Sequence, residues 1–225
     1  MQRKSFLKLK DFFSGFNPVL DISIKKNQYF PIDLSLENEK LHTLNLASAD
    51  DMECYINNLL KENNSTVAYG GYLEKRNLYK RSSYFNDKKE RNIHLGIDYW
   101  CDENTAVISP LDGEIHSFKN NKNFGDYGPT LILSHNVEDF SFYTLYGHLT
   151  EESISNIKKG QSVSKNEVIG FLGSNNINGN YAPHLHFQII LDLQNKKGDY
   201  PGVCSKEDVL FYSNNSPDPN IIVGL

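Results

Sequence analysis

Short apolar runs separated by polar turns dominate the chain from about residue 92 onward. Gly, Asp and Asn stand between the runs, and these residues favour tight turns. Strands that follow one another this closely indicate antiparallel β structure. We therefore expect a mainly β fold, arranged as a sandwich or an open barrel. The runs are AVISP, EIHSF, TLILSH, FSFYTLYGHL, KKGQSV, KNEVIGFLG and HLHFQIIL.

The first 66 residues have a different pattern, typical of a small α/β accessory region. Residues 48–60 predict an amphipathic helix, because Ser48 is a good N-cap residue with Asp51 three positions later. Its apolar stripe is Met52, Ile56, Leu59 and Leu60, and a second helical spacing links Phe6, Leu9, Phe12 and Phe13. The segment KENNSTVAYGGY, residues 61–72, is interpreted as a loop and as the domain boundary. The prediction is an accessory region at 1–66 and a second domain at 67–225.

Composition and net charge limit the classes of partner and site that the chain can have. The chain has 225 residues, 39% of them hydrophobic, and a net charge of -5. It can bury a sizeable core, and its charge has the wrong sign for a nucleic-acid-binding protein. The basic stretch at residues 73–91 is interpreted as a solvated loop. Cys54, Cys101 and Cys204 form no C-x-x-C pair, so neither a disulfide framework nor a thiolate zinc site is expected.

The N-terminus begins with basic residues but lacks the apolar core of a secretory signal. Lys8, Lys10 and Asp11 interrupt each candidate run. No window approaches the roughly 18 apolar residues of a membrane span. From the sequence we expect no signal peptide, no membrane span and a cytoplasmic location.

Two histidines lie close together in HLHFQI. If this segment is a strand, His184, His186 and Gln188 share one face, while the apolar residues between them take the other. The two imidazoles are then roughly 6.6 Å apart along the strand. Both could bind one metal, one could bind while the other stands beside it, or the strand could simply be packed.

The segments NIHLGIDYW and LYGHL add further candidates. His94 and Asp98 would lie roughly 13 Å apart on a straight strand, so they can share a metal only if the chain bends, which Gly96 permits. The alternatives are a local cap for Asp98 and a structural role for His148. Two imidazoles and one carboxylate, with a fourth position open, are typical of catalytic zinc. The sequence has no H-E-x-x-H motif.

The motifs HLGID, YGHL and PHLHFQI, in this order, resemble those of the lysostaphin-type zinc endopeptidases, whose catalytic domain is the LytM domain. The resemblance covers roughly residues 90–192. It implies a duplicated hybrid motif fold with one Zn²⁺ per chain, bound by His94, Asp98 and His186. It also implies that His148 and His184 are the catalytic pair. The expected function is a zinc-dependent endopeptidase that hydrolyses a peptide bond in peptidoglycan or a related peptide.

Other positions carry weaker expectations. The family commonly has a tyrosine where this chain has Lys88, so that stabilising group is missing or supplied elsewhere. His135 is interpreted as structural or as a neighbour of the ligands, and Tyr146 as a residue of the groove. His42 and His116 are expected to have no function in the site.

Two other functions compete with the peptidase. The first is a non-catalytic LytM-type module that binds or regulates a partner. The second is a phosphocarrier of related β fold, which Asp98 disfavours because a carboxylate beside His94 would repel phosphate. The sequence leaves open which of His148 and His184 is the general base, and it does not indicate an oligomeric state.

Overall fold

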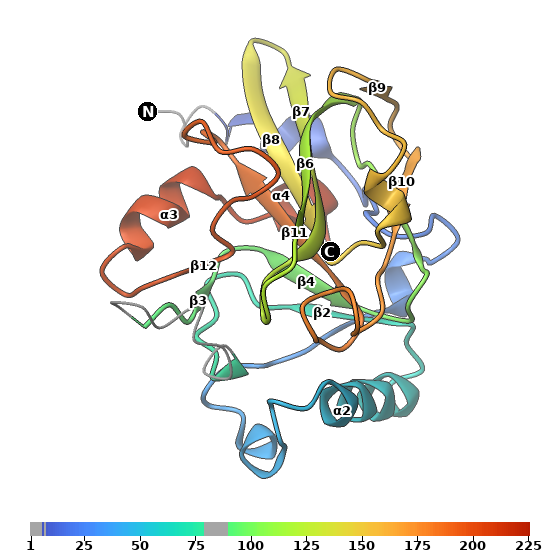
Figure 1. The fold of residues 1–225 in the computed structure, drawn as a ribbon, viewed down its shortest axis with the longest axis vertical. Coiled ribbons are helices and arrows are strands. Elements are labelled where there is room, and N and C mark those ends of the chain that lie inside the picture. Colours follow the sequence, from blue (N-terminus) through green and yellow to red (C-terminus); the bar gives the residue numbers. More distant parts are fainter. Residues whose placement is uncertain (1–5, 7, 79–89) are drawn as a thin grey trace.

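The computed structural model describes residues 6, 8–78 and 90–225. Its centre is an eight-stranded sheet with the order β1-β2-β4-β11-β8-β7-β6-β9 (Figure 1). β1 and β2 pair in parallel, and the other neighbours in this sheet pair antiparallel. The prediction of a mainly β, largely antiparallel fold is confirmed. The strands are β1 (Tyr29–Pro31), β2 (Val67–Gly70), β4 (Ile97–Trp100), β6 (Gly113–Asn121), β7 (Gly128–Val137), β8 (Phe140–Gly147), β9 (Ser162–Val163) and β11 (His184–Ile190).

Two small sheets and several short helices surround the large sheet. β5 (Ala106–Ile108) pairs with β10 (Val168–Phe171), and β3 (Ile93–His94) pairs with β12 (Val203–Cys204). The α-helices are α2 (Ala49–Glu62), α3 (Val209–Asn215) and α4 (Asn220–Val223). The 3-10 helices are η1 (Lys8–Phe13), η2 (Lys26–Gln28), η3 (Glu39–Thr43) and η6 (Glu152–Ile154). Among the described residues, no helix has the length and apolar character needed to cross a membrane.

Helix α2 forms where the sequence predicts it. The Ser48 hydroxyl caps its first turn by accepting a hydrogen bond from the Asp51 backbone N–H at 3.1 Å. Met52, Ile56 and Leu60 are buried in a cluster that includes Trp100 of β4. Burying a side chain of this size contributes about 1.5–3 kcal/mol, so the apolar stripe fixes α2 against the sheet.

The predicted loop at residues 61–72 is wrong for 67–70. These residues form β2, which pairs with β1 on one side and β4 on the other. Four residues flanked by Asn, Ser and Gly carry no alternating pattern, and the strand is stabilised by its two neighbours. β1 therefore belongs to the same sheet as the strands beyond residue 67. The division between residues 66 and 67 stays a prediction.

The core explains why β11 is apolar on one face and polar on the other. All seven residues of β11 are buried, and it lies between β4 and β8 near the middle of the sheet. Leu185 and Phe187 pack into the main apolar cluster with Tyr99 and Tyr146. The alternation of a strand then directs His184 and His186 to the opposite face, where they meet the candidate site.

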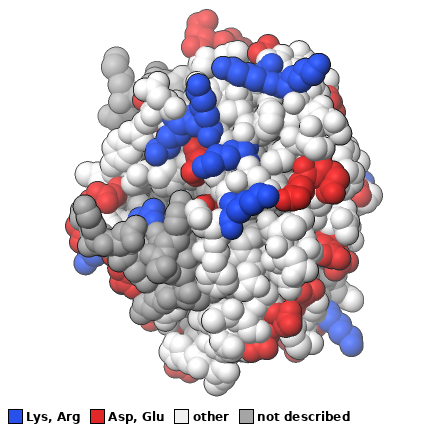
Figure 2. All heavy atoms as spheres, in the orientation of Figure 1, with Lys and Arg blue, Asp and Glu red and all other residues white. Residues whose placement is uncertain are grey.

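The surface carries charges of both signs. On the face shown in Figure 2, most of the described Lys and Arg side chains lie in the upper half, and acidic side chains lie among and below them.

Candidate metal centre

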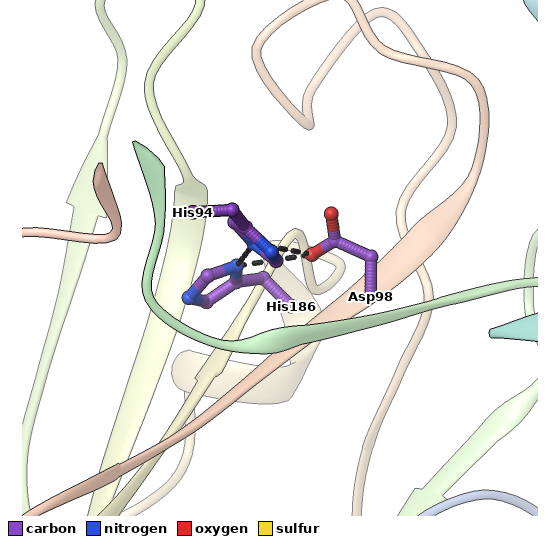
Figure 3. Close-up of side chains that lie close together, drawn as sticks. All are labelled: His94, Asp98 and His186. Atoms are coloured by element: carbon purple, nitrogen blue, oxygen red, sulfur yellow. Dashed lines mark hydrogen bonds and ion pairs between the residues drawn. The ribbon is translucent and has the colours of Figure 1, made fainter. Parts of the chain in front are cut away.

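Three buried polar side chains meet where β3, β4 and β11 come together (Figure 3). Asp98 and His186 lie directly opposite each other in the antiparallel pairing of β4 with β11. The chain turns between β3 and β4 at Leu95 and Gly96, which brings His94 back over Asp98. His94 Nε2 lies 2.9 Å from His186 Nδ1 and 3.2 Å from Asp98 Oδ1, and His186 Nδ1 lies 3.0 Å from Asp98 Oδ1. The bend that shared binding requires is present.

Hydrogen bonds on the outer sides of both rings fix their tautomers. His94 Nδ1 lies 3.1 Å from the Gly71 carbonyl, which can only accept, so Nδ1 carries the proton. His186 Nε2 lies 2.9 Å from Gln188 Oε1. The Gln188 amide nitrogen donates to the Pro201 carbonyl at 3.1 Å, so the amide oxygen faces the ring. His94 Nε2 and His186 Nδ1 therefore present lone pairs to each other and to the carboxylate.

Burial and charge keep this donor set in its metal-binding form. Burial lowers the pKa of His94 to about 3, so the imidazole is neutral at pH 7. Burial by itself raises the pKa of Asp98, but the Arg76 guanidinium beside it favours the ionised carboxylate, and that pKa lies well below its usual range. Three converging lone pairs without a proton between them repel one another. A divalent cation relieves this repulsion, and two imidazoles with one carboxylate suit zinc.

His148 and His184 lie together beside the trio of His94, Asp98 and His186. Their ring centroids are 4.2 Å apart, and His184 Nε2 lies 3.9 Å from Asp98 Oδ1. His148 Nδ1 donates to the Asn178 carbonyl at 2.7 Å, and His184 Nδ1 donates to the Ala182 carbonyl at 2.8 Å. Each ring therefore carries its lone pair on Nε2. Burial lowers the pKa of His184 to about 4 and the pKa of His148 well below its usual range, so both are neutral at pH 7.

All five residues line one cleft of about 170 Å³. Tyr127 forms part of its wall, with its ring 5.1 Å from that of His186 and 5.7 Å from that of His148. Charged side chains of both signs also line the cleft, so it can accept polar groups. The other lining residues are Leu78, Arg91, Gly125, Asp126, Tyr181, Lys196, Asp199, Tyr200, Pro201, Gly202 and Val203.

The remaining sequence expectations have different outcomes. Tyr146 does not line the cleft; it is fully buried in the main apolar cluster. Strand alternation would place it beside His148, but β8 ends at Gly147 and His148 has a left-handed φ of 65°. His135 is bonded to the Asp112 carbonyl and Thr144, away from the trio. Lys88 lies outside the described residues.

Several residues that contact the site had no role assigned to them from the sequence. Gln188 had a signal, since it follows His186 by two positions on the same strand face. The sequence carries no signal for the carbonyls of Gly71 and Asn178, because any residue can supply a backbone acceptor. Arg76 also lacked one, since it falls in a charged stretch interpreted as a solvated loop, yet its side chain is fully buried beside Asp98.

The match to a family model covers this site. Residues 92–199 match the model described as peptidase family M23. The resemblance to the lysostaphin-type LytM peptidases is thereby confirmed, and the M23 region contains all five candidate residues.

Two curated proteins that match part of this chain are named as metalloproteases. A Haemophilus influenzae protein named an uncharacterized metalloprotease is 33% identical over 113 residues, covering 48% of this chain and 22% of that protein. A Buchnera aphidicola protein of the same name is 31% identical over 119 residues, covering 50% and 29%. The matches thus span less than a third of either curated relative.

Solved structures also show similarity to part of this chain. The catalytic domain of lysostaphin from Staphylococcus simulans is 24% identical, with 54% of this chain and 80% of that chain covered and a TM-score of 0.38. A zinc-containing peptidase from Vibrio cholerae is 28% identical, with 44% and 27% covered and a TM-score of 0.35. The family match and the names of the two relatives support the prediction of a peptidase-type hydrolase.

Proposed function

We propose that this chain is a zinc-dependent endopeptidase that hydrolyses an amide bond in peptidoglycan or a related peptide. The observation that carries the proposal is the convergence of three buried lone pairs, on His94 Nε2, Asp98 Oδ1 and His186 Nδ1, within 3.2 Å of one another. The match of residues 92–199 to the peptidase family M23 model supports it. His94, Asp98 and His186 would hold one zinc ion per chain.

A bound zinc ion supplies Lewis-acid activation of water and polarisation of the scissile carbonyl. The chain supplies the proton transfers. His148 and His184 are neutral and carry a lone pair on Nε2, so either can accept a proton from the attacking water. The resulting imidazolium can protonate the leaving amine or donate a hydrogen bond to the oxyanion. The Asn178 and Ala182 carbonyls hold the two rings in place throughout.

The cleft favours an extended polar peptide. Arg91, Lys196, Asp126 and Asp199 line it together with several tyrosines, so it offers charged, hydrogen-bonding and aromatic contacts. A peptide chain with amide groups and charged ends matches this lining better than an apolar ligand does.

Substitution of the two histidines tests the proposal. In His148→Ala and His184→Ala, we expect zinc to remain bound at one per chain, because neither residue belongs to the trio. We expect hydrolysis of purified peptidoglycan or of glycine-rich peptides to fall by about 10²–10⁴-fold. Zinc content is measured by elemental analysis, and hydrolysis by release of free amino groups with and without a chelator.

The matched control is His116→Ala. His116 lies on β6 and bonds to Ser117 outside the cleft, so its replacement is expected to leave both zinc content and hydrolysis unchanged. Unaltered hydrolysis in His184→Ala and His148→Ala would contradict the assignment of the catalytic pair. A wild-type protein that binds these peptides but does not cleave them, with or without zinc, would favour the non-catalytic binding module.

A further inference from the structure

Arg76 is a fully buried arginine that contacts Asp98 on the side facing away from His94 and His186. Its Nη1 donates to Asp98 Oδ2 at 2.5 Å, and the exposed fraction of its side chain is 0%. The other carboxylate oxygen, Oδ1, is the one that faces His94 and His186. One side chain thus engages the oxygen that is turned away from the trio.

Glu74 holds Arg76 in this position. Its Oε2 accepts a hydrogen bond from Arg76 Nε at 2.5 Å, and its Oε1 accepts one from the Leu34 backbone N–H at 3.0 Å. The guanidinium therefore bridges two carboxylates, Glu74 and Asp98. A buried positive charge beside a cation site would weaken cation binding, and Glu74 compensates that charge locally.

Packing around the guanidinium leaves it little freedom. Its central carbon lies 5.4 Å from the centroid of the Trp100 ring, and Nη2 donates to the Gly70 carbonyl at 3.3 Å. The neighbouring Gly71, with a φ of 122°, supplies the carbonyl that accepts from His94 Nδ1. A Cβ at Gly71 would lie 2.2 Å from both Arg76 Nη2 and Glu74 Oε2. The segment 70–76 therefore orients two members of the trio, Asp98 and His94.

We propose that Arg76, held by Glu74, is a positioning residue that reserves Asp98 Oδ2 and leaves Oδ1 as the single oxygen presented to the metal. The proposal rests on the metal centre of the proposed function and deepens it. Without Arg76, Oδ2 is free to turn toward the cation and the carboxylate can rotate. Groups that orient a metal ligand typically change metal affinity or activity by about 10–100-fold.

Metal affinity and metal spectra test this role without any peptide substrate. Metal-free Arg76→Met, Arg76→Lys and wild-type protein are titrated with zinc in competition with a chromogenic chelator. We expect Arg76→Met to bind zinc about 10–100-fold more weakly, and Arg76→Lys to recover part of the loss because it keeps one charged donor. Cobalt(II) reconstitution provides a second readout, since a change in carboxylate coordination alters its visible absorption.

Thr144→Val is the control for a general loss of stability. Thr144 is buried and bonds to His135, but it does not line the cleft. We expect it to lower the melting temperature while its zinc affinity and cobalt spectrum match the wild type. This separates a positioning role from unspecific damage to the fold.

Glu74→Gln carries the test if Arg76→Met does not fold. It keeps the shape of the side chain but removes the charge that fixes the guanidinium, so zinc affinity and the cobalt spectrum are expected to change in the same direction. Wild-type zinc affinity in Glu74→Gln and in any folded Arg76 variant would overturn the proposal. If the wild type binds zinc but cleaves no peptide, the proposed function fails, whereas a loss of zinc affinity in Arg76→Met still supports the positioning role.

Discussion

Gly96 leaves the space that the His186 ring occupies. A Cβ at this position would lie 2.6 Å from the Phe187 carbonyl oxygen and 2.8 Å from His186 Cε1 and Nε2. The first of these atoms is backbone at the centre of the sheet and cannot move cheaply. The glycine that permits the bend between His94 and Asp98 is therefore also required by close packing against β11.

Gly96→Ala is expected to weaken the metal centre. The added methyl group must displace the His186 ring or separate the turn from β11, at a cost of about 1–3 kcal/mol in the free energy of unfolding. Zinc affinity should fall by at least about tenfold, because His186 Nδ1 moves relative to Asp98 Oδ1. Chelator competition measures the affinity and chemical denaturation measures the stability.

Gly160→Ala serves as the control for this change. Gly160 has open space around its Cβ position, but its φ of 81° makes alanine strained there. It should lose stability and keep wild-type zinc affinity. If Gly96→Ala also keeps wild-type affinity, close packing at Gly96 does not position the ligand.

The loop between β10 and β11 orients His148, one of the two candidate catalytic residues. Its Asn178 carbonyl accepts from His148, and the Asn178 side chain donates to the Tyr181 carbonyl at 3.1 Å and accepts from the Tyr181 N–H at 2.9 Å. His148 itself is anchored by backbone bonds to Tyr127 and Gly173, each of 2.8 Å. The loop and the end of β8 therefore form one hydrogen-bonded unit.

Asn178→Ala is expected to reduce turnover without affecting zinc. Removing the amide releases the turn that presents the carbonyl to His148, at about 1–3 kcal/mol in stability because buried polar groups lose partners. The kcat for peptide hydrolysis should fall by about tenfold or more, while zinc content stays at one per chain. Asn175→Ala, in the same loop but with an exposed bond to Asp50, should leave kcat unchanged. Equal kcat in the two variants would argue against a role for the loop in orienting His148.

Sequence patterns predicted the elements that carry their own periodicity. Helix α2 has an apolar stripe and a cap, and β11 alternates between core and site residues, so both could be predicted. β2 could not, since its four residues are stabilised by β1 and β4 rather than by a pattern. The burial of Arg76 could not be predicted either, because only the tertiary fold brings the residues after β2 next to Asp98. The five candidate site residues came from motif order, and their assignment to individual roles stays a prediction.

The N- and C-terminal segments cover the large sheet together. Phe6 and Phe13 pack with Phe142 of β8 and Ile222 of α4 in one apolar cluster. The Asn17 N–H donates to the Val223 carbonyl at 2.9 Å, which links the N-terminal segment to α4. The His135 ring stacks on Phe142 of this cluster. The burial of this titratable group therefore depends on how the terminal segments pack on the sheet.

Stability should therefore fall on acidification, and His135 should account for part of the fall. Burial lowers the pKa of His135 below its usual 6.5 in the folded protein, while the unfolded chain titrates near 6.5. The unfolded state then binds more protons below pH 6.5, so the free energy of unfolding falls by up to about 1.4 kcal/mol per pH unit for this residue, until its folded pKa is reached. Above pH 6.5 the contribution is fully retained.

Urea denaturation of metal-free protein between pH 7.5 and 5.5 measures this dependence. The slope of stability against pH should be shallower in His135→Gln than in the wild type, by at most the equivalent of one proton. The exposed His42 provides the matched variant, His42→Gln, in which the wild-type slope is expected. Buried His94, His148 and His184 have lowered pKa values as well, so the remaining slope in His135→Gln should still be positive. An identical slope in His135→Gln and the wild type would mean that His135 takes up its proton in the folded protein as readily as in the unfolded chain.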